Sequence, residues 1–285
     1  MKWLLSLFLL TTLAHAETSI LIPAFLEAIE IYGSETQHHL YLRAEVRTIL
    51  TVLREKNIPL ERLEHVRFSK GHWHLRADDK FDTWIKNPLH QSSDLNVPKI
   101  SFHATKIDVI KSSQYMGDDV YAYFFVTDGV IPTGKVTDIY KNISSRQGFF
   151  FNATDRAIFP PIGIPAKTPQ NHLIVDYGII ESDGDDIKAL QQLSSIIIDM
   201  AIAVYTTQNT PTGQVLVSLR KEIKALADLL LTQNSDDRLI TGSIGYTSQE
   251  ITELLSKKSY VDVAKSHQNE GAFGWDYKIQ FRMLR

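Results

Sequence analysis

Seven acidic side chains fall in three short stretches, and each stretch borders a strand-like apolar run. They are Asp118, Asp119, Glu181, Asp183, Asp185, Asp236 and Asp237. Carboxylates crowded on loops repel one another unless water, a basic partner or a cation screens them, and calcium takes several oxygen ligands from such loops. The grouping therefore predicts a calcium site if the three loops meet at one end of the fold. The alternative is that these residues form turns, because Asp favours loops by hydrogen bonding to its own backbone.

A single EF-hand loop does not fit the sequence. If Asp183 is counted as the first position of such a loop, the twelfth position is Ser194. An EF-hand needs a glutamate there, because this residue closes the coordination shell. A calcium site would therefore have to draw its ligands from separate loops.

The histidines offer a second metal chemistry. His72 and His74 are two residues apart on an expected strand, so their side chains share one face and could both bind zinc. Four nearby side chains could complete the ligand set: Asp78, Asp79, His38 or His39. The chain has no His-Glu-x-x-His spacing, and two surface histidines beside Trp73 are the alternative interpretation.

Other catalytic patterns are weak. Residues 242–245 (GSIG) miss the Gly-x-Ser-x-Gly nucleophile spacing by one residue, and the sequence contains no glycine-rich phosphate loop. An aromatic group could bind a sugar or lipid, but strands of a sandwich need such residues for their core, and core packing is the favoured interpretation. This group consists of Tyr121, Tyr123, Phe124, Phe125, Phe149, Phe150 and Phe151.

The first residues are typical of a secretory signal peptide. Residues 1–16 hold one early lysine, an apolar run and a small-x-small cleavage site, Ala14-His15-Ala16. The net charge of −3 gives no support for nucleic-acid binding, which needs a basic field. The chain has no cysteine, so its fold must stand on its core, and residues 196–205 are too short to span a bilayer. We expect an exported protein, periplasmic or extracellular, with no transmembrane span in its mature chain.

The apolar spacing predicts an α+β chain. Residues 17–98 are expected to form a helical N-terminal segment with a small hairpin that carries the two histidines, because apolar residues recur every three or four positions between residues 20 and 53. From residue 99 to 285, short β-prone runs predict an antiparallel β-sandwich. Four prolines between residues 160 and 169 predict a long exposed loop. Residues 187–231 predict a helical hairpin inserted into the sandwich.

Three segments resemble parts of the C2-type calcium-binding β-sandwich domains. They are residues 116–121 (MGDDVY), 180–183 (IESD) and 235–242 (SDDRLITG), and they occur in the family's order within residues 100–285. The resemblance implies calcium bound between loops at one end of the sandwich by the seven carboxylates. The chain departs from the family's pattern in its helical insertion and in Arg238, which could neutralise the neighbouring aspartates without a metal.

These patterns predict a non-catalytic binding protein that engages an envelope component, either a protein or a lipid headgroup, with calcium as the expected cofactor. One alternative is a zinc-dependent hydrolase centred on His72 and His74. A second is a structural or inhibitory partner protein that docks through its apolar helical hairpin. The sequence leaves these three functions open.

Overall fold

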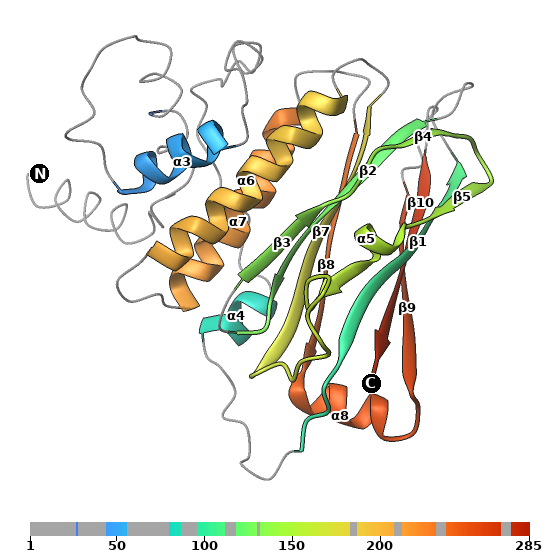
Figure 1. Ribbon diagram of the computed structural model, residues 1–285. Helices are drawn as coiled ribbons and strands as arrows, with labels where there is room; N and C mark the ends of the chain where they lie inside the picture. Colours follow the sequence, from blue (N-terminus) through green and yellow to red (C-terminus); the bar gives the residue numbers. More distant parts are fainter. Residues whose placement is uncertain are drawn as a thin grey trace, which may run out of the picture.

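The computed structural model describes residues 27, 44–55, 80–86, 96–111, 118–129, 132–182, 187–207, 213–231, 238–268 and 275–285 (Figure 1). Its elements are α3 (Ala44–Glu55), α4 (Lys80–Lys86), β1 (Ser101–Lys111), β2 (Asp118–Thr127), β3 (Pro132–Val136), β4 (Tyr140–Ile143), β5 (Gln147–Phe150), α5 (Ala153–Arg156), β6 (Ala157–Phe159), β7 (His172–Ser182), α6 (Ile187–Thr207), α7 (Gly213–Leu231), β8 (Arg238–Thr247), α8 (Ser248–Ser256), β9 (Tyr260–Gln268) and β10 (Asp276–Leu284). The predicted signal peptide and the predicted hairpin with His72 and His74 lie outside the described residues.

The strands form two antiparallel sheets that pack as a sandwich. The open sheet has the order β5-β1-β10-β9, with β6 beside β1, and the covered sheet has the order β3-β2-β7-β8, with β4 beside β2. Between them lies the core, in which the Phe281 ring contacts Phe102 at 5.6 Å and Phe124 at 6.3 Å between ring centroids. The predicted fold class, an α+β chain with an antiparallel sandwich and an inserted helical hairpin, is confirmed.

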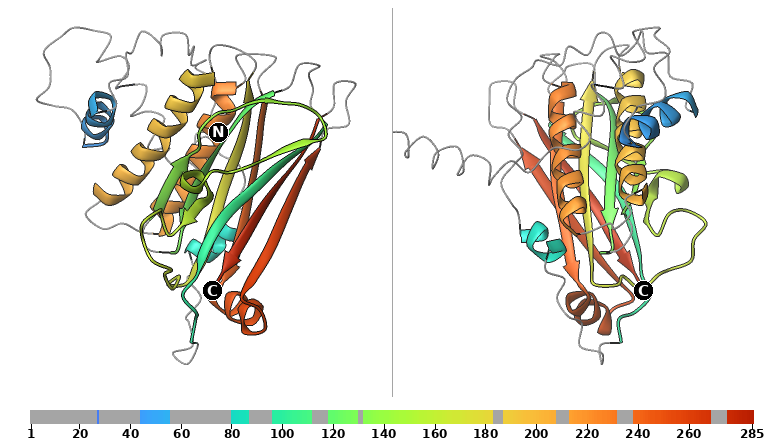
Figure 2. Two further views of the ribbon diagram at one scale, coloured as in Figure 1. Left: turned by 45° about the vertical axis from the view of Figure 1, so that its right-hand side comes forward. Right: turned by 90° about the vertical axis from the view of Figure 1, so that its left-hand side faces the viewer.

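The two sheets differ in what covers their outer faces. Helices α6 and α7 lie against the outer face of the covered sheet, whereas no described helix covers that of the open sheet (Figure 2). Strand burial records this difference: β2 is buried at nearly every position, while β10 alternates between buried and half-buried residues. A strand that is covered on both faces needs apolar side chains in succession, and β2 has them.

The apolar side of the helical hairpin is buried within the chain. Ile197, Met200 and Val204 of α6 and Leu216 and Ile223 of α7 are all buried. The close approach of α6 to the covered sheet depends on Gly134, where a Cβ atom would lie 2.0 Å from Ile198 Cγ2. Among the described residues, no helix combines the length and the apolar character that a membrane crossing requires.

Two local expectations need correction. Phe150 is 72% exposed, although it was grouped with the core aromatics; it points to the outer face of the open sheet, while its neighbours Phe149 and Phe151 are buried. Helix α8 was not predicted, although its start carries a capping box in which the Thr247 hydroxyl accepts from the Glu250 N–H and the Glu250 side chain accepts from the Thr247 N–H.

Candidate functional site

Three of the seven predicted calcium ligands lie in the described residues, at one end of the covered sheet. The register pairs Val120 with Glu181 and Asp119 with Ser182, so the start of β2 lies beside the end of β7. Asp118 and Glu181 are buried, and Asp118 accepts a hydrogen bond from the Tyr277 hydroxyl of the open sheet. The start of β2 and the end of β7 therefore lie side by side, and the predicted site stays a prediction.

The side chain of Asp119 is bound on the surface. Its Oδ1 accepts from the Asn142 N–H at 2.9 Å, and its Oδ2 lies 3.8 Å from Lys141 Nζ. Successive residues of a strand point to opposite faces, which separates Asp119 from Asp118. Within the described part of the chain, no group of three or more His, Cys, Asp or Glu side chains is placed to hold a metal ion.

The remaining predicted ligands cannot be placed. Asp183, Asp185, Asp236 and Asp237 lie outside the described residues, as do His72, His74 and the side chains proposed to complete a zinc site. The calcium and zinc sites stay predictions.

A buried ion cluster that was not predicted lies between α7 and the covered sheet. The Arg220 guanidinium donates from Nε to Asp176 Oδ2 at 2.5 Å, from Nη2 to Asp176 Oδ1 at 2.9 Å and from Nη1 to Asp82 Oδ1 of α4 at 2.6 Å. Lys224 Nζ lies 3.0 Å from Asp176 Oδ1 and donates to Ser243 Oγ at 2.9 Å. The cluster thus fastens α4 and α7 to β7.

The charges in this cluster are strongly coupled. Burial acts to raise the pKa of Asp176, but the Arg220 guanidinium, Lys224 and the Ser243 hydroxyl outweigh it and lower the pKa to about 2. A signal for the cluster was present in the sequence. Asp176 is the single charge in the apolar run 173–180, and Arg220 shares a helical stripe with Leu216 and Ile223.

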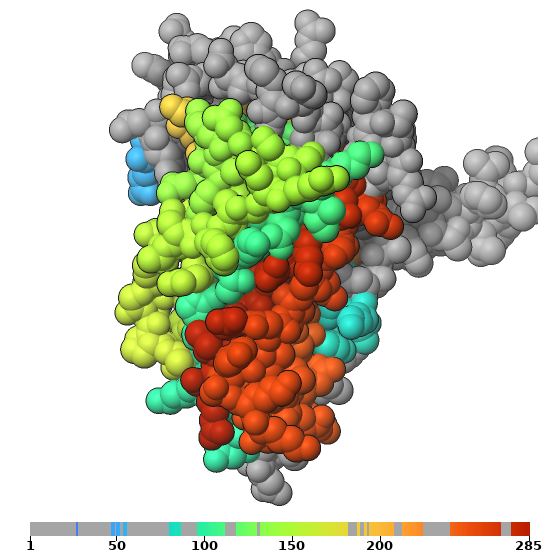
Figure 3. All heavy atoms as spheres, turned by 90° about the vertical axis from the view of Figure 1, so that its right-hand side faces the viewer, coloured from blue at the N-terminus to red at the C-terminus, as the bar shows by residue number. Residues whose placement is uncertain are grey.

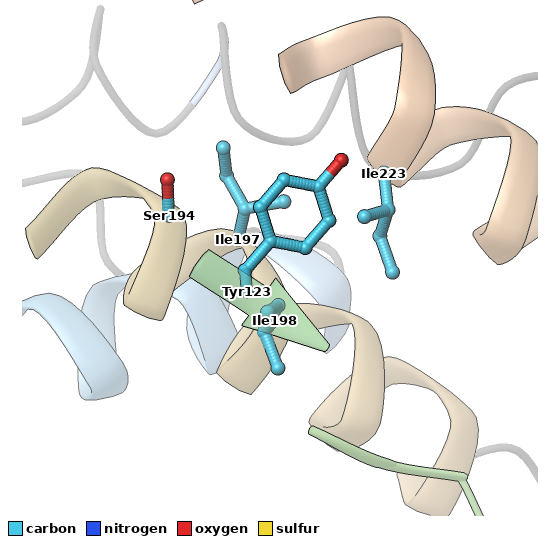
Figure 4. Close-up of a pocket in the computed structure, with 5 residues that line it drawn as sticks. All are labelled: Tyr123, Ser194, Ile197, Ile198 and Ile223. Carbon is cyan, nitrogen blue, oxygen red and sulfur yellow. The ribbon is translucent and has the colours of Figure 1, made fainter. Parts of the chain in front are cut away.

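A small pocket lies between β2, α6 and α7 (Figure 4). Its lining is Tyr123, Ser194, Ile197, Ile198 and Ile223. Ser194 Oγ is hydrogen bonded to the Tyr121 hydroxyl at 3.0 Å, and Tyr123 packs over Gly178, where a Cβ atom would lie 2.1 Å from its ring. The lining offers neither a carboxylate nor an imidazole, so it supports no acid–base or metal chemistry.

The predicted proline-rich loop is exposed, and its tip is apolar. Residues 161–166 (PIGIPA), which we name the apolar tip, contain no polar side chain. Ile162 is 57% exposed and Ile164 is 55% exposed. Gly163 between them has a φ angle of +84°, and nothing lies within 4 Å of the position that its Cβ would take. The chain between the two isoleucines therefore faces open space.

The base of the loop is fixed to the sandwich. Ile100 and Lys167 exchange two backbone hydrogen bonds of 3.0 Å, and Phe159 is buried in the core. Lys167 Nζ lies 2.6 Å from Oδ2 of the buried Asp128. Within the tip, the Ile164 N–H donates to the Pro161 carbonyl at 3.1 Å. These contacts fix the base of the loop and the turn within the tip.

Around the base of the loop, the basic side chains are exposed and most of the acidic side chains are buried. Lys99 and Arg156 are exposed, and the Lys167 side chain is 45% exposed. Their acidic neighbours Asp128 and Asp155 are buried. The exposed Asp138 accepts a hydrogen bond from Asn152 Nδ2 at 2.9 Å. Among these residues the exposed charges are mainly basic, and Figure 3 shows the loop, in yellow-green, at the rim of the open sheet's face.

Comparisons with known proteins do not assign a family. No family model matches the chain, and no curated protein matches it. A chain from a solved structure described as "CC2D1B coordinates ESRCT-III activity during the mitotic reformation of the nuclear envelope" is 12% identical, with a TM-score of 0.27, and the match covers 84% of this chain and 71% of that one. A likeness this low carries no argument about fold or function.

Proposed function

We propose that this chain is an exported, non-catalytic protein that binds an anionic lipid surface through the apolar tip. The observation that carries the proposal is the pair of exposed isoleucines, Ile162 and Ile164, on a loop whose surroundings expose cations. Exposed apolar groups that adjoin one another mark interaction sites more often than isolated ones do. An apolar tip bordered by basic side chains suits a bilayer interface, where acyl chains lie beneath anionic headgroups.

The energies expected for such a contact are modest. Moving one isoleucine side chain out of water contributes about 1–2 kcal/mol, because roughly half of each is already buried. Each basic residue near an anionic surface adds about 1 kcal/mol. Lys167 is already paired with Asp128, so Lys99 and Arg156 supply the charge, and these contributions support reversible attachment and not permanent insertion.

The fixed base favours binding because the tip loses little freedom when it enters a membrane. Ordering a backbone residue costs about 1–2 kcal/mol. The Ile100–Lys167 hydrogen bonds and the Lys167–Asp128 ion pair already order the base of the loop in the folded protein, so this cost does not arise again on binding. A flexible loop of the same composition would bind more weakly.

Vesicle flotation of the mature chain tests the proposal. We expect binding to phosphatidylcholine vesicles that contain phosphatidylglycerol, and at least about a tenfold loss of partitioning in the double variant Ile162→Ser, Ile164→Ser, since each isoleucine contributes about 1–2 kcal/mol. The matched control is Ile110→Ser, Leu254→Ser, which removes two other exposed apolar side chains and should bind like the wild type. Equal binding by the tip variant and the control would reject the proposal.

The basic residues have a separate test. The variant Lys99→Ala, Arg156→Ala should weaken binding to the anionic vesicles about thirtyfold at low salt, because two contributions of about 1 kcal/mol are lost. The control Lys257→Ala, Lys258→Ala changes two exposed lysines at the end of α8 and should have little effect. Binding by the Lys99, Arg156 variant that equals the wild type would show that headgroup charge plays no part.

The proposal does not require calcium. Isothermal titration of chelator-treated protein tests the predicted site of Asp118, Asp119, Glu181 and the four carboxylates outside the described residues. A heat of binding, together with a melting temperature that calcium raises, would show that the protein binds calcium. The zinc hydrolase centred on His72 and His74 stays a prediction, which metal analysis of a His72→Ala, His74→Ala variant would test.

A further inference from the structure

Strand β9 forms a long, regular and exposed edge of the open sheet. Its nine residues pair with β10 in unbroken register, whereas the pairing of β1 with β10 has two register shifts. It contains no proline or glycine, and six of its nine residues are exposed, Tyr260 and Ala264 among them. Among the described residues, no strand pairs with its outer edge.

The other sheet edges are protected in ways that β9 is not. Edge strands β3, β5 and β6 have only five, four and three residues. Strand β8 has ten residues, one more than β9, but its described side chains are buried or half-buried, and α7 and α8 pack beside it. Short or covered edges keep other chains from pairing, while a long regular edge is a template for an added strand.

We propose that β9 pairs antiparallel with β9 of a second copy of this chain, about a two-fold axis at Ala264. The two open sheets then join into one continuous sheet. A second copy fits this edge because it supplies a strand of equal length and the commonest symmetry of oligomers. The inference is independent of the lipid proposal and concerns a different part of the surface.

The register follows from the sequence of β9. With Ala264 on the axis, all nine residues pair, Asp262 faces Ser266, Tyr260 faces Gln268, and no two like charges oppose each other. Moving the axis to Lys265 sets two lysines against each other, and moving it to Val263 leaves only seven residues paired. Like charges directly opposite are destabilising in antiparallel pairs, so the axis at Ala264 is favoured.

Substitutions at Ser266 test the proposed register. A charge at this position should act in opposite directions on the pairing within one chain and on the pairing across the axis. Within one chain, Ser266 pairs with Lys278 of β10, on the outer face of the open sheet. Across the proposed axis it faces Asp262 of the second copy. Ser266→Lys should therefore disfavour the monomer's own sheet and tighten the dimer, while Ser266→Asp should do the reverse. Arg282 already binds Asp262 in its own chain, which moderates both effects.

Sedimentation velocity of the mature chain, without lipid, measures these effects. We expect a monomer–dimer equilibrium whose dissociation constant falls about threefold in Ser266→Lys and rises about threefold in Ser266→Asp, as expected for cross-strand pairs of several tenths of a kcal/mol. Ala264→Lys, which sets two lysines against each other on the axis, should weaken the dimer at least about tenfold. Circular dichroism of each variant verifies the fold.

Three results would overturn the inference. The first is a wild-type protein that stays monomeric up to about 100 μM, because a strand-pairing dimer of use to the protein would form below that level. The second is a dimer that Ala264→Lys leaves intact. The third is a shift of the dissociation constant in the same direction for both Ser266 variants. Because no vesicles are present, none of these results bears on the apolar tip.

Discussion

Two arginine–aspartate pairs have nearly equal geometry, and each includes an aspartate of a different sheet. Arg220 binds Asp176 of the covered sheet at 2.5 and 2.9 Å, and Arg282 binds Asp262 of the open sheet at 2.6 and 2.9 Å. The side chains of the first pair are 1% and 3% exposed, whereas those of the second are 43% and 54% exposed. Water competes for the second pair only, so burial and not geometry decides what each pair does.

The outer faces of the two sheets differ in the same way as the two pairs. On the covered sheet, the ion cluster and the apolar stripes of α6 and α7 turn the outer face into a second core. On the open sheet, the outer face, the edge strand β9 and the nearby apolar tip remain exposed to solvent. The β9 edge belongs to the open sheet, and the apolar tip lies at the rim of its face.

The largest effect should come from breaking the buried pair. Arg220→Met leaves Asp82 and Asp176 as buried charges without their guanidinium, which should lower the free energy of unfolding by about 3–5 kcal/mol. Urea unfolding measures it. Arg282→Met on the open sheet is the matched control and should leave the midpoint nearly unchanged. Equal losses in the two variants would contradict the comparison.

A smaller effect should appear as a pH dependence. Burial lowers the pKa of His172 to about 4; Asp128 opposes this shift and Arg220 adds to it. The unfolded chain then binds a proton at higher pH than the folded chain. The stability should therefore fall as the pH drops from about 6.5 to 4, by about 3 kcal/mol in total.

His172→Leu should remove this window, which urea midpoints measured at successive pH values would show. A second loss, of about 2 kcal/mol, should follow below the unfolded pKa of Asp176, 3.8, as the pH falls through its folded pKa of about 2. A pH dependence between 6.5 and 4 that His172→Leu leaves unchanged would contradict the assignment to this side chain.

The smallest effect is expected on the open face. Phe150→Ala should leave the urea midpoint unchanged, because this ring is largely in water, while Phe149→Ala removes a ring that stacks on Tyr140 at 4.1 Å and should be clearly destabilising. Phe149 and Phe150 are adjacent in β5, so these two variants compare the buried face of the open sheet with its exposed face. A loss of stability in Phe150→Ala would show that the open face is covered in solution.

Much of the fold could be predicted from the sequence because its signals are local. Short β-prone runs predicted the sandwich, and residues 187–231 predicted the helical hairpin of α6 and α7. The direction of a single side chain was harder to predict: the acidic run before Val120 does not tell which carboxylate points inward, and the Tyr277 hydroxyl that binds Asp118 comes from 159 residues further along the chain.

The sites missed by sequence analysis depend on contacts between distant segments. Arg220 meets Asp176 across 44 residues and Asp82 across 138. The prolines predicted an exposed loop, but not the Lys167–Asp128 pair, 39 residues apart, that fixes its base. Local patterns do not encode such pairings.

The most direct test of the proposed function uses the lack of cysteine in this chain. A cysteine introduced at Ile164 can be labelled with an environment-sensitive fluorophore and titrated with phosphatidylglycerol-containing vesicles, with the same label at Ile110 as the control. We predict a blue-shifted, brighter emission for the label at position 164 and none at position 110. Emission at position 164 that vesicles leave unchanged, under conditions where the protein floats with them, would contradict the account.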